Sequence, residues 1–107
     1  MSGIASIYAT FASDEEARRI GRALIEERLA ACVNIIGRCQ SIYRWQGRIE
    51  EADEVAAIFK VAAGQAEPAL KRIAEQHSYD VPAAVVWPIE RSLPAYAAWV
   101  VAEAGAS

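Results

Sequence analysis

Two long extended segments that fold back on each other dominate this sequence. Residues 40–45 and 48–61 are predicted to be strands, and Gln46-Gly47 between them is typical of a turn. Every second residue at the end of the later strand is apolar: Val55, Ala57, Phe59 and Val61. Side chains at alternate positions share one face of a sheet. The arms are longer than two ordinary helices can cover, which predicts that another subunit covers the remainder.

The other segments alternate between strand and helix patterns. In chain order we expect strand 4–11, helix 14–30, strand 32–36, the hairpin, helix 66–74, strand 81–89 and a helix after residue 92. Ser13 and Glu16 form a capping box before the first helix. Pro82 and Pro88 place strand 81–89 at a sheet edge or beside a bulge, because proline lacks a backbone donor.

The order β-α-β-β-α-β with an extra C-terminal helix predicts an α+β, ferredoxin-like fold with an antiparallel sheet. Two helices would cover one face of this sheet and leave the other face open. The open face is a second reason, beside the long hairpin, to expect an obligate oligomer.

The composition describes one folded domain, residues 1–107, with a modest core. Apolar residues make up 54% of the chain, and 23 residues are alanine, which contributes little buried area. The 11 Lys and Arg against 14 Asp and Glu give a net charge of −3. This hydrophobicity argues against disorder. The negative charge argues against a nucleic-acid partner, because phosphate binding needs a positive field.

The sequence shows no segment that targets a membrane. No stretch approaches the roughly 20 consecutive apolar residues of a membrane helix, and the features of a signal peptide are missing. We therefore expect no membrane partner and a cytoplasmic location, where thiols stay reduced. Cys32 and Cys39 are seven positions apart, so on a regular strand they would face opposite ways unless a bulge intervenes. An intrachain disulfide is not expected.

Few side chains are suited to catalysis, and we expect that the protein is not an enzyme. Cys32 lies in the apolar segment 29–33, a setting that disfavours a reactive thiolate. The six glycines show neither GxGxxG nor P-loop spacing.

His77 is the candidate metal ligand. A structural zinc site normally needs four Cys or His ligands, whereas the chain has two Cys and one His. A threefold axis would present three copies of His77, or His77 could act with a carboxylate of a neighbour. The competing interpretation is that His77 ends the second helix, where a positive charge suits the helix dipole.

A run of acidic residues follows the hairpin turn. Four carboxylates could bind a hard cation, but alternation along a strand splits them between two faces. Charged residues that protect a sheet edge are the competing interpretation. The residues are Glu50, Glu51, Asp53 and Glu54.

An aromatic and basic tripeptide, Tyr43-Arg44-Trp45, precedes the turn. RNA-binding domains of this fold need an aromatic, basic third strand, whereas residues 50–54 contain four acids, which argues against that class. Tyr43 and Trp45 share a strand face and are predicted to contact another subunit.

Five segments together resemble the CutA divalent-cation tolerance family. They occur in the family's order and spacing and lie within residues 4–101: residues 29–34, 41–50, 77–82, 87–89 and 96–99. The most specific segment is the hairpin motif Tyr-x-Trp-x-Gly-x-Ile-Glu, which runs from Tyr43 to Glu50.

The resemblance implies a tight homotrimer, similar in architecture to the PII signalling proteins. It also implies a part in tolerance to divalent ions, with copper binding as the usual attribution and no firmly attached enzymatic reaction. The interface residues expected from it are Tyr43, Trp45, Tyr79, Tyr96 and Trp99.

This chain departs from the family pattern at positions relevant to metals. Ala9 and Thr10 stand where some members have a cysteine, and Ala83 stands where a glutamate is common. Ser78 is the second residue of the segment that corresponds to the family's His-Pro-Tyr motif. Because two potential ligands are missing, any binding of copper or another divalent cation is expected to be weak.

Three functions remain open at this point. The first is a trimeric metal-responsive protein that binds a divalent cation through His77 and nearby carboxylates. The second is a PII-like sensor that binds a small anionic ligand between subunits through Arg44, Arg48 and Lys60. The third is a structural trimer on which protein partners dock.

Overall fold

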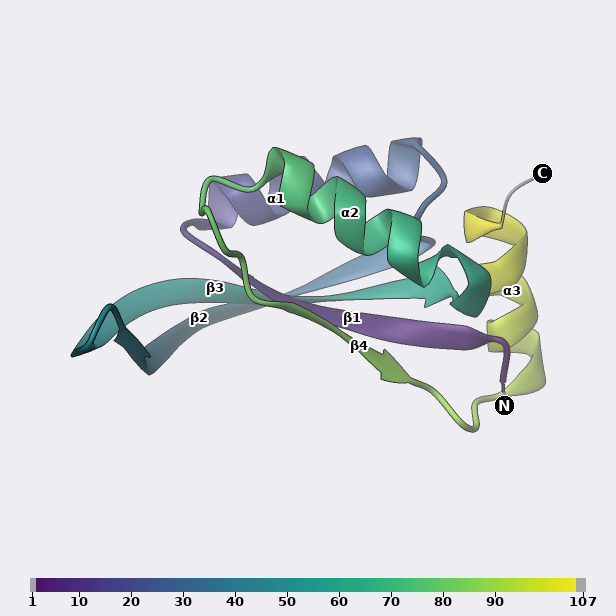
Figure 1. Ribbon diagram of the computed structural model, residues 1–107. Coiled ribbons are helices and arrows are strands. Elements are labelled where there is room, and N and C mark those ends of the chain that lie inside the picture. Colours follow the sequence, from purple (N-terminus) through teal and green to yellow (C-terminus); the bar gives the residue numbers. More distant parts are fainter. Residues whose placement is uncertain (1, 106–107) are drawn as a thin grey trace.

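The computed structural model describes residues 2–105, which form one antiparallel sheet and three α-helices (Figure 1). The elements are β1 Ile4–Phe11, α1 Asp14–Glu26, β2 Cys32–Trp45, β3 Arg48–Ala62, a 3-10 turn Ala63–Gln65, α2 Ala66–Gln76, β4 Ala84–Pro88 and α3 Pro94–Ala104. The four strands lie in the order β2-β3-β1-β4. Helices α1 and α2 cover one face of the sheet, and α3 lies at the end opposite the hairpin turn. The predicted α+β, ferredoxin-like fold is confirmed.

The core lies between the two helices and the sheet. Alternate residues of β1 and β3 point toward the helices, as the period-two pattern predicts. The largest fully buried side chains in this layer are Phe11, Phe59, Ile7, Ile20, Leu24, Ile73 and Val61. A second, smaller cluster fixes α3 against the sheet through Ile4, Ala31, Val100 and Ala104.

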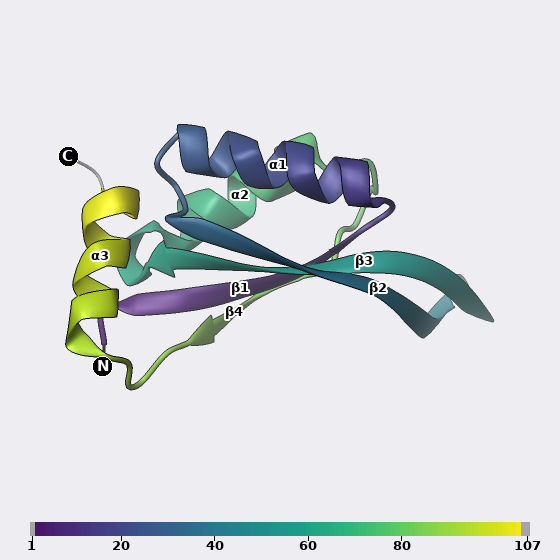
Figure 2. The same ribbon diagram turned by 180° about the vertical axis from the view of Figure 1, so that it is seen from behind.

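The hairpin is longer than the helix-covered part of the sheet. β2 and β3 pair from Cys32 opposite Lys60 to Trp45 opposite Arg48. Its turn end projects beyond α1 and α2 in both views (Figures 1 and 2). The predicted overhang is therefore a feature of the fold.

β2 is one strand with a bulge, rather than the two strands expected from the sequence. The register shifts between Ile35 and Gly37, where Gly37 has a φ of +122° that other residues rarely adopt. The extra residue also changes the side on which later residues lie. Cys32 and Cys39 now pair with residues of the same face, and both thiols are free.

Two element boundaries differ from the sequence-based expectation. α1 ends at Glu26, because the backbone amides of Leu29 and Ala30 both donate to the Leu24 carbonyl and Arg28 adopts a φ of +60°. β4 begins only at Ala84, two residues after Pro82, which lacks a backbone donor. β4 is an edge strand, as its prolines predicted.

Gly21 provides a test of the packing between α1 and β2. A Cβ atom at this position would lie 2.9 Å from Cγ1 of Val33. A Gly-to-Ala change inside a helix normally stabilises by about 1 kcal/mol. Here we expect Gly21→Ala to lower the free energy of unfolding by about 1–2 kcal/mol, because Val33 must move. Chemical denaturation measures it, and the added substitution Val33→Ala should remove the penalty specific to the clash. Stabilisation by Gly21→Ala alone would contradict the packing.

Candidate functional site

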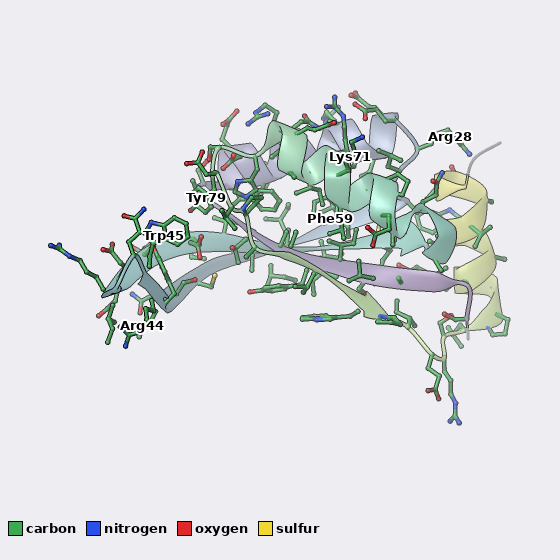
Figure 3. The ribbon with its side chains drawn as sticks, in the orientation of Figure 1. Arg28, Arg44, Trp45, Phe59, Lys71 and Tyr79 are labelled. Atoms are coloured by element: carbon green, nitrogen blue, oxygen red, sulfur yellow. The ribbon has the colours of Figure 1, made fainter. Side chains whose placement is uncertain are left out.

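A pocket of about 560 Å³ lies where the hairpin meets the segment between α2 and β4. Ile7, Ala9 and Phe11 of β1 face the helices, so Tyr8 and Thr10 lie on the other face, which belongs to the pocket. The lining residues come from β1, β2, β3 and segment 79–83: Tyr8, Thr10, Ser41, Tyr43, Trp45, Glu54, Tyr79, Asp80, Val81 and Ala83. Trp45 and Tyr79 lie at the same end of the molecule in Figure 3.

Glu54 is the buried acidic group of this pocket, with only 8% of its surface exposed. Oγ of Ser41 donates to its Oε1 at 2.5 Å, and the Tyr79 hydroxyl donates to its Oε2 at 3.0 Å. Burial, together with the hydrogen bond to Glu54 and its charge, raises the pKa of Tyr79 to about 12. Tyr79 therefore stays a neutral hydrogen-bond donor across the physiological range.

A second buried carboxylate, Glu16, fixes the segment that forms one wall of the pocket. Its oxygens accept hydrogen bonds from the backbone amides of Ala12 and Ser78 at 3.1 and 2.7 Å, and from Oγ of Ser78 at 3.1 Å. Ser13 caps α1 by accepting from the Glu16 amide, as the capping box predicted. Burial acts to raise the pKa of Glu16, but the hydrogen bonds from Ser78 and Ala12 hold it below the ordinary value.

His77 is buried next to this carboxylate, and both of its ring nitrogens have partners within the chain. Nε2 lies 2.7 Å from the Thr10 carbonyl oxygen, and Nδ1 accepts from the Tyr79 amide at 3.1 Å. A carbonyl can only accept, so Nε2 carries the proton and the arrangement suits the neutral ring. The ring also stacks on Phe11, with centroids 5.0 Å apart. His77 thus connects the end of α2 to the end of β1.

Within residues 2–105, no group of three or more His, Cys, Asp or Glu side chains is arranged to hold a metal ion. The four acidic residues that follow the hairpin turn do not lie together on one face of the sheet either. Glu50 and Glu54 pair with Tyr43 and Cys39, which places them on one face, while Glu51 and Asp53 occupy the other. The role of His77 as a ligand stays a prediction.

The three cationic residues expected to bind an anion do not meet within one subunit. Arg44 and Arg48 lie beside the hairpin turn, whereas Lys60 lies twelve residues further along β3, about 40 Å away at strand spacing. Nζ of Lys60 donates to Oδ1 of Asn34 at 3.4 Å. A shared site for all three would require more than one subunit.

The residues expected at a trimer interface fall into two groups. Tyr43, Trp45 and Tyr79 line the pocket. Tyr96 and Trp99 lie on α3 at the other end, with ring centroids 6.0 Å apart. Burial and the nearby Cys32 raise the pKa of Tyr96 to about 12, and its hydroxyl lies 3.7 Å from that sulfur.

Sequence reasoning did not identify the Ser41–Glu54–Tyr79 cluster as a unit. Its members come from β2, β3 and the segment after α2, so no local spacing connects them. The alternation along β3 that places Val55 in the core also places Glu54 on the opposite face. This was the only signal in the sequence that Glu54 belongs to the open face. The stacked pair Tyr8 and Trp87, with centroids 5.1 Å apart on the same face, was also missed.

The elements and the pocket together define a ferredoxin-like α+β domain with an extended hairpin and an acidic, aromatic pocket on its open face. The model of the CutA1 divalent ion tolerance protein family matches residues 5–103, so the chain belongs to this family. The resemblance found in the sequence is confirmed.

Relatives agree with this assignment. The chain is 44% identical over 95 residues to the divalent-cation tolerance protein CutA of Thermus thermophilus, covering 88% of this chain and 91% of that protein. It is 35% identical over 97 residues to mouse Protein CutA, covering 91% of this chain but 55% of the mouse protein, and it spans 64% of the Xenopus laevis homologue. The chain thus spans less than two thirds of these two relatives.

Solved structures show the same fold. The structure of the Thermus thermophilus protein has a TM-score of 0.92 at 38% identity, covering 95% of this chain and 99% of that chain. The Archaeoglobus fulgidus structure, described as a periplasmic divalent cation tolerance protein, has a TM-score of 0.91 at 38% identity, covering 94% and 98%. In residues 2–105 of this chain, no helix has the length and hydrophobicity needed to span a membrane.

Proposed function

We propose that this chain functions as a homotrimer in tolerance to divalent cations. The observation that supports assembly is the amount of large apolar surface exposed along the hairpin and the open sheet face. Ile42 and Ile49 are each 70% exposed on one face of the hairpin, and Tyr43 and Trp45 are half-exposed on its other face. Val85 and Trp87 are half-exposed on β4, at the other edge of the sheet. A surface of this kind marks a protein interface. The proposed role in tolerance to divalent cations rests on the family, whose members are named for divalent-cation tolerance.

Cation binding in this proposal uses donors from more than one subunit, because residues 2–105 of one subunit provide no metal-binding cluster. For His77 to act as a ligand, one ring nitrogen would have to give up its hydrogen bond to Thr10 or Tyr79. Ala9 and Thr10 also stand where some family members have a cysteine, and Ala83 stands where a glutamate is common. Both points support weak binding of copper or a similar ion.

A PII-like sensor of an anionic ligand is the second candidate. Arg44 and Arg48 are exposed next to the hairpin turn, and none of the salt bridges formed within residues 2–105 uses either of them. Assembly could bring them near Lys60 of another subunit. In this candidate, Arg44→Ala weakens binding of a nucleotide such as ATP.

Native mass spectrometry of untagged protein, alone and with copper(II), tests the main proposal. We expect a mass of three subunits, copper adducts on the trimer, and fewer adducts in His77→Ala at equal copper concentration. Cys39→Ser is the control for adventitious binding to a half-buried thiol. A thermal melt of His77→Ala separates lost ligation from lost structure. A monomer would contradict the assembly, and unchanged adducts in a folded His77→Ala trimer would contradict the role of His77.

The location of the protein stays a prediction. The Archaeoglobus relative is described as periplasmic and the Arabidopsis thaliana relative as chloroplastic. We propose a cytoplasmic location for this chain, supported by its two free cysteines.

A further inference from the structure

Glu54 is a buried carboxylate whose partners within the subunit are neutral. Both of its hydrogen bonds come from hydroxyl groups, those of Ser41 and Tyr79. No Lys, Arg or His side chain among residues 2–105 forms an ion pair with it. Buried charges in proteins are normally paired with an opposite charge, because removal from water is costly. A carboxylate can accept further hydrogen bonds on both oxygens, so Glu54 retains capacity for a cationic partner.

The surroundings of Glu54 define what kind of cation fits and where it comes from. Val55 beside it points into the core, so Glu54 faces the side of the sheet that the helices leave open. In the proposed homotrimer this side is covered by another subunit, and the missing cation therefore belongs to that subunit. Aromatic rings of Tyr43, Trp45 and Tyr79 line the same pocket. A guanidinium group stacks on aromatic rings and binds a carboxylate through two parallel hydrogen bonds, which favours an arginine.

Arg48 is the arginine of the hairpin that lies on the same face as Glu54. It pairs with Trp45, a residue of the pocket, and directly opposite residues of paired strands share a face. Arg44 pairs with Ile49 and lies on the other face. Arg48 and Glu54 are six positions apart on β3, about 20 Å at strand spacing. Arg48 therefore cannot reach the Glu54 of its own subunit.

The location and the free charge of Arg48 both favour a contact with a neighbour. The hairpin turn projects beyond α1 and α2 (Figures 1 and 2), and Arg48 is the first residue of β3 after this turn. Its side chain is exposed and takes part in none of the salt bridges of the described chain. Lys60, the other hairpin cation on this face, lies near the far end of β3 and already donates to Asn34.

We propose that Arg48 of one subunit enters the pocket of the next subunit and forms an ion pair with the partner's Glu54. The inference rests on the proposed homotrimer and deepens it, because it names the side chains that determine which two surfaces meet. The two surfaces are different parts of the subunit, and such a contact closes into a ring when it repeats around a symmetry axis. The acidic site is incomplete without the neighbour.

Exchange of the two charges tests this pair in the full chain. Arg48→Glu and Glu54→Lys should each weaken trimer formation at least about tenfold, because each leaves a charge buried without its partner. The double variant Arg48→Glu/Glu54→Lys should recover most of this loss. Analytical ultracentrifugation over a range of protein concentrations, in urea below the unfolding transition, measures the dissociation of the trimer.

Arg44→Glu is the matched control, since it makes the same charge change beside the turn but on the other face of the hairpin. Combination of Arg44→Glu with Glu54→Lys should give no recovery. Circular dichroism reports whether each variant is folded. If Glu54→Lys does not fold, Arg48→Gln, Glu54→Gln and their combination provide a second test. The combined variant should then dissociate no more readily than the weaker of the two single variants, because either change alone already breaks the pair.

Two results would overturn the pair and leave the homotrimer standing. The first is a trimeric wild type in which the effects of the two changes simply multiply in the double variant. The second is recovery of Glu54→Lys by Lys60→Glu instead of Arg48→Glu, which would identify a different cation as the partner. A wild type that remains a monomer at every concentration would overturn the homotrimer and the pair together.

Discussion

Replacing Glu16 with alanine is expected to lower the free energy of unfolding by about 3 kcal/mol. The change leaves the amides of Ala12 and Ser78 without their acceptor, and a hydrogen bond to a charged group contributes about 1.5–3 kcal/mol. Glu16 is only 4% exposed, so water cannot easily replace it. Chemical denaturation at a fixed protein concentration measures the loss, since unfolding of the proposed trimer would depend on concentration.

The neighbouring residue Glu15 provides the matched control. Its side chain is 82% exposed, and Glu15→Ala should change the free energy of unfolding by no more than about 0.5 kcal/mol. Glu16→Gln keeps the shape and one acceptor, so its effect should lie between those of Glu15→Ala and Glu16→Ala. Equal effects of Glu15→Ala and Glu16→Ala would contradict the role assigned to the Glu16 hydrogen bonds.

The same carboxylate makes stability depend on pH in a defined direction. Burial opposes its ionisation, but the hydrogen bonds from Ser78 and Ala12 lower the pKa of Glu16 in the folded state below its ordinary value of 4.5. A lowered folded-state pKa contributes stability above the unfolded value, and this contribution is lost as pH falls through the folded value. We expect the difference between wild type and Glu16→Gln to shrink as the pH falls below about 4.5. His77 at 3.9 Å and Arg19 at 4.0 Å are the basic groups that face Glu16.

Replacing Phe59 with alanine is expected to lower the free energy of unfolding by about 3–5 kcal/mol. Phe59 is fully buried in the layer between sheet and helices, and its ring centroid lies 6.3 Å from that of Phe11. Phe59→Ala would leave a cavity in this layer. Many of the surrounding core residues are alanines, whose side chains are too short to fill it. Phe59→Leu retains most of the volume and should cost less than half as much. A loss below about 1 kcal/mol in Phe59→Ala would contradict the central position of this ring.

The order of elements could be predicted from the sequence because each signal is local. β1 begins and ends where the apolar pattern placed it, and the capping residue Ser13 marks the start of α1. The turn at Gln46 and Gly47, both with positive φ, also has a local cause. Gly37 was a partial signal for the bulge at Ile36. A glycine alone, however, does not distinguish a bulge within one strand from the end of that strand.

The pocket could not be predicted in the same way, because its contacts join distant parts of the chain. The amide of Ser78 meets Glu16 across 62 positions, and the Tyr79 hydroxyl meets Glu54 across 25. His77 was selected from its residue type as a ligand candidate, whereas its surroundings are those of a hydrogen-bonded core side chain. Residue type and spacing did not reveal that both ring nitrogens of His77 have hydrogen-bonding partners within the chain.

The position of β1 in the sheet has a consequence for the order of folding. β2 and β3 are neighbours in sequence and can pair as soon as both have been synthesised, whereas β1 lies between β3 and β4. Its partners come late in the chain: Ile4 pairs with Ala62, and Ala5 pairs with Pro88. Contacts between such distant residues form slowly, because a long loop must close first. Of the four strands in this sheet, β1 is synthesised first but enclosed on both edges only after β4 has been made, so its apolar residues depend on the later strands for protection from aggregation.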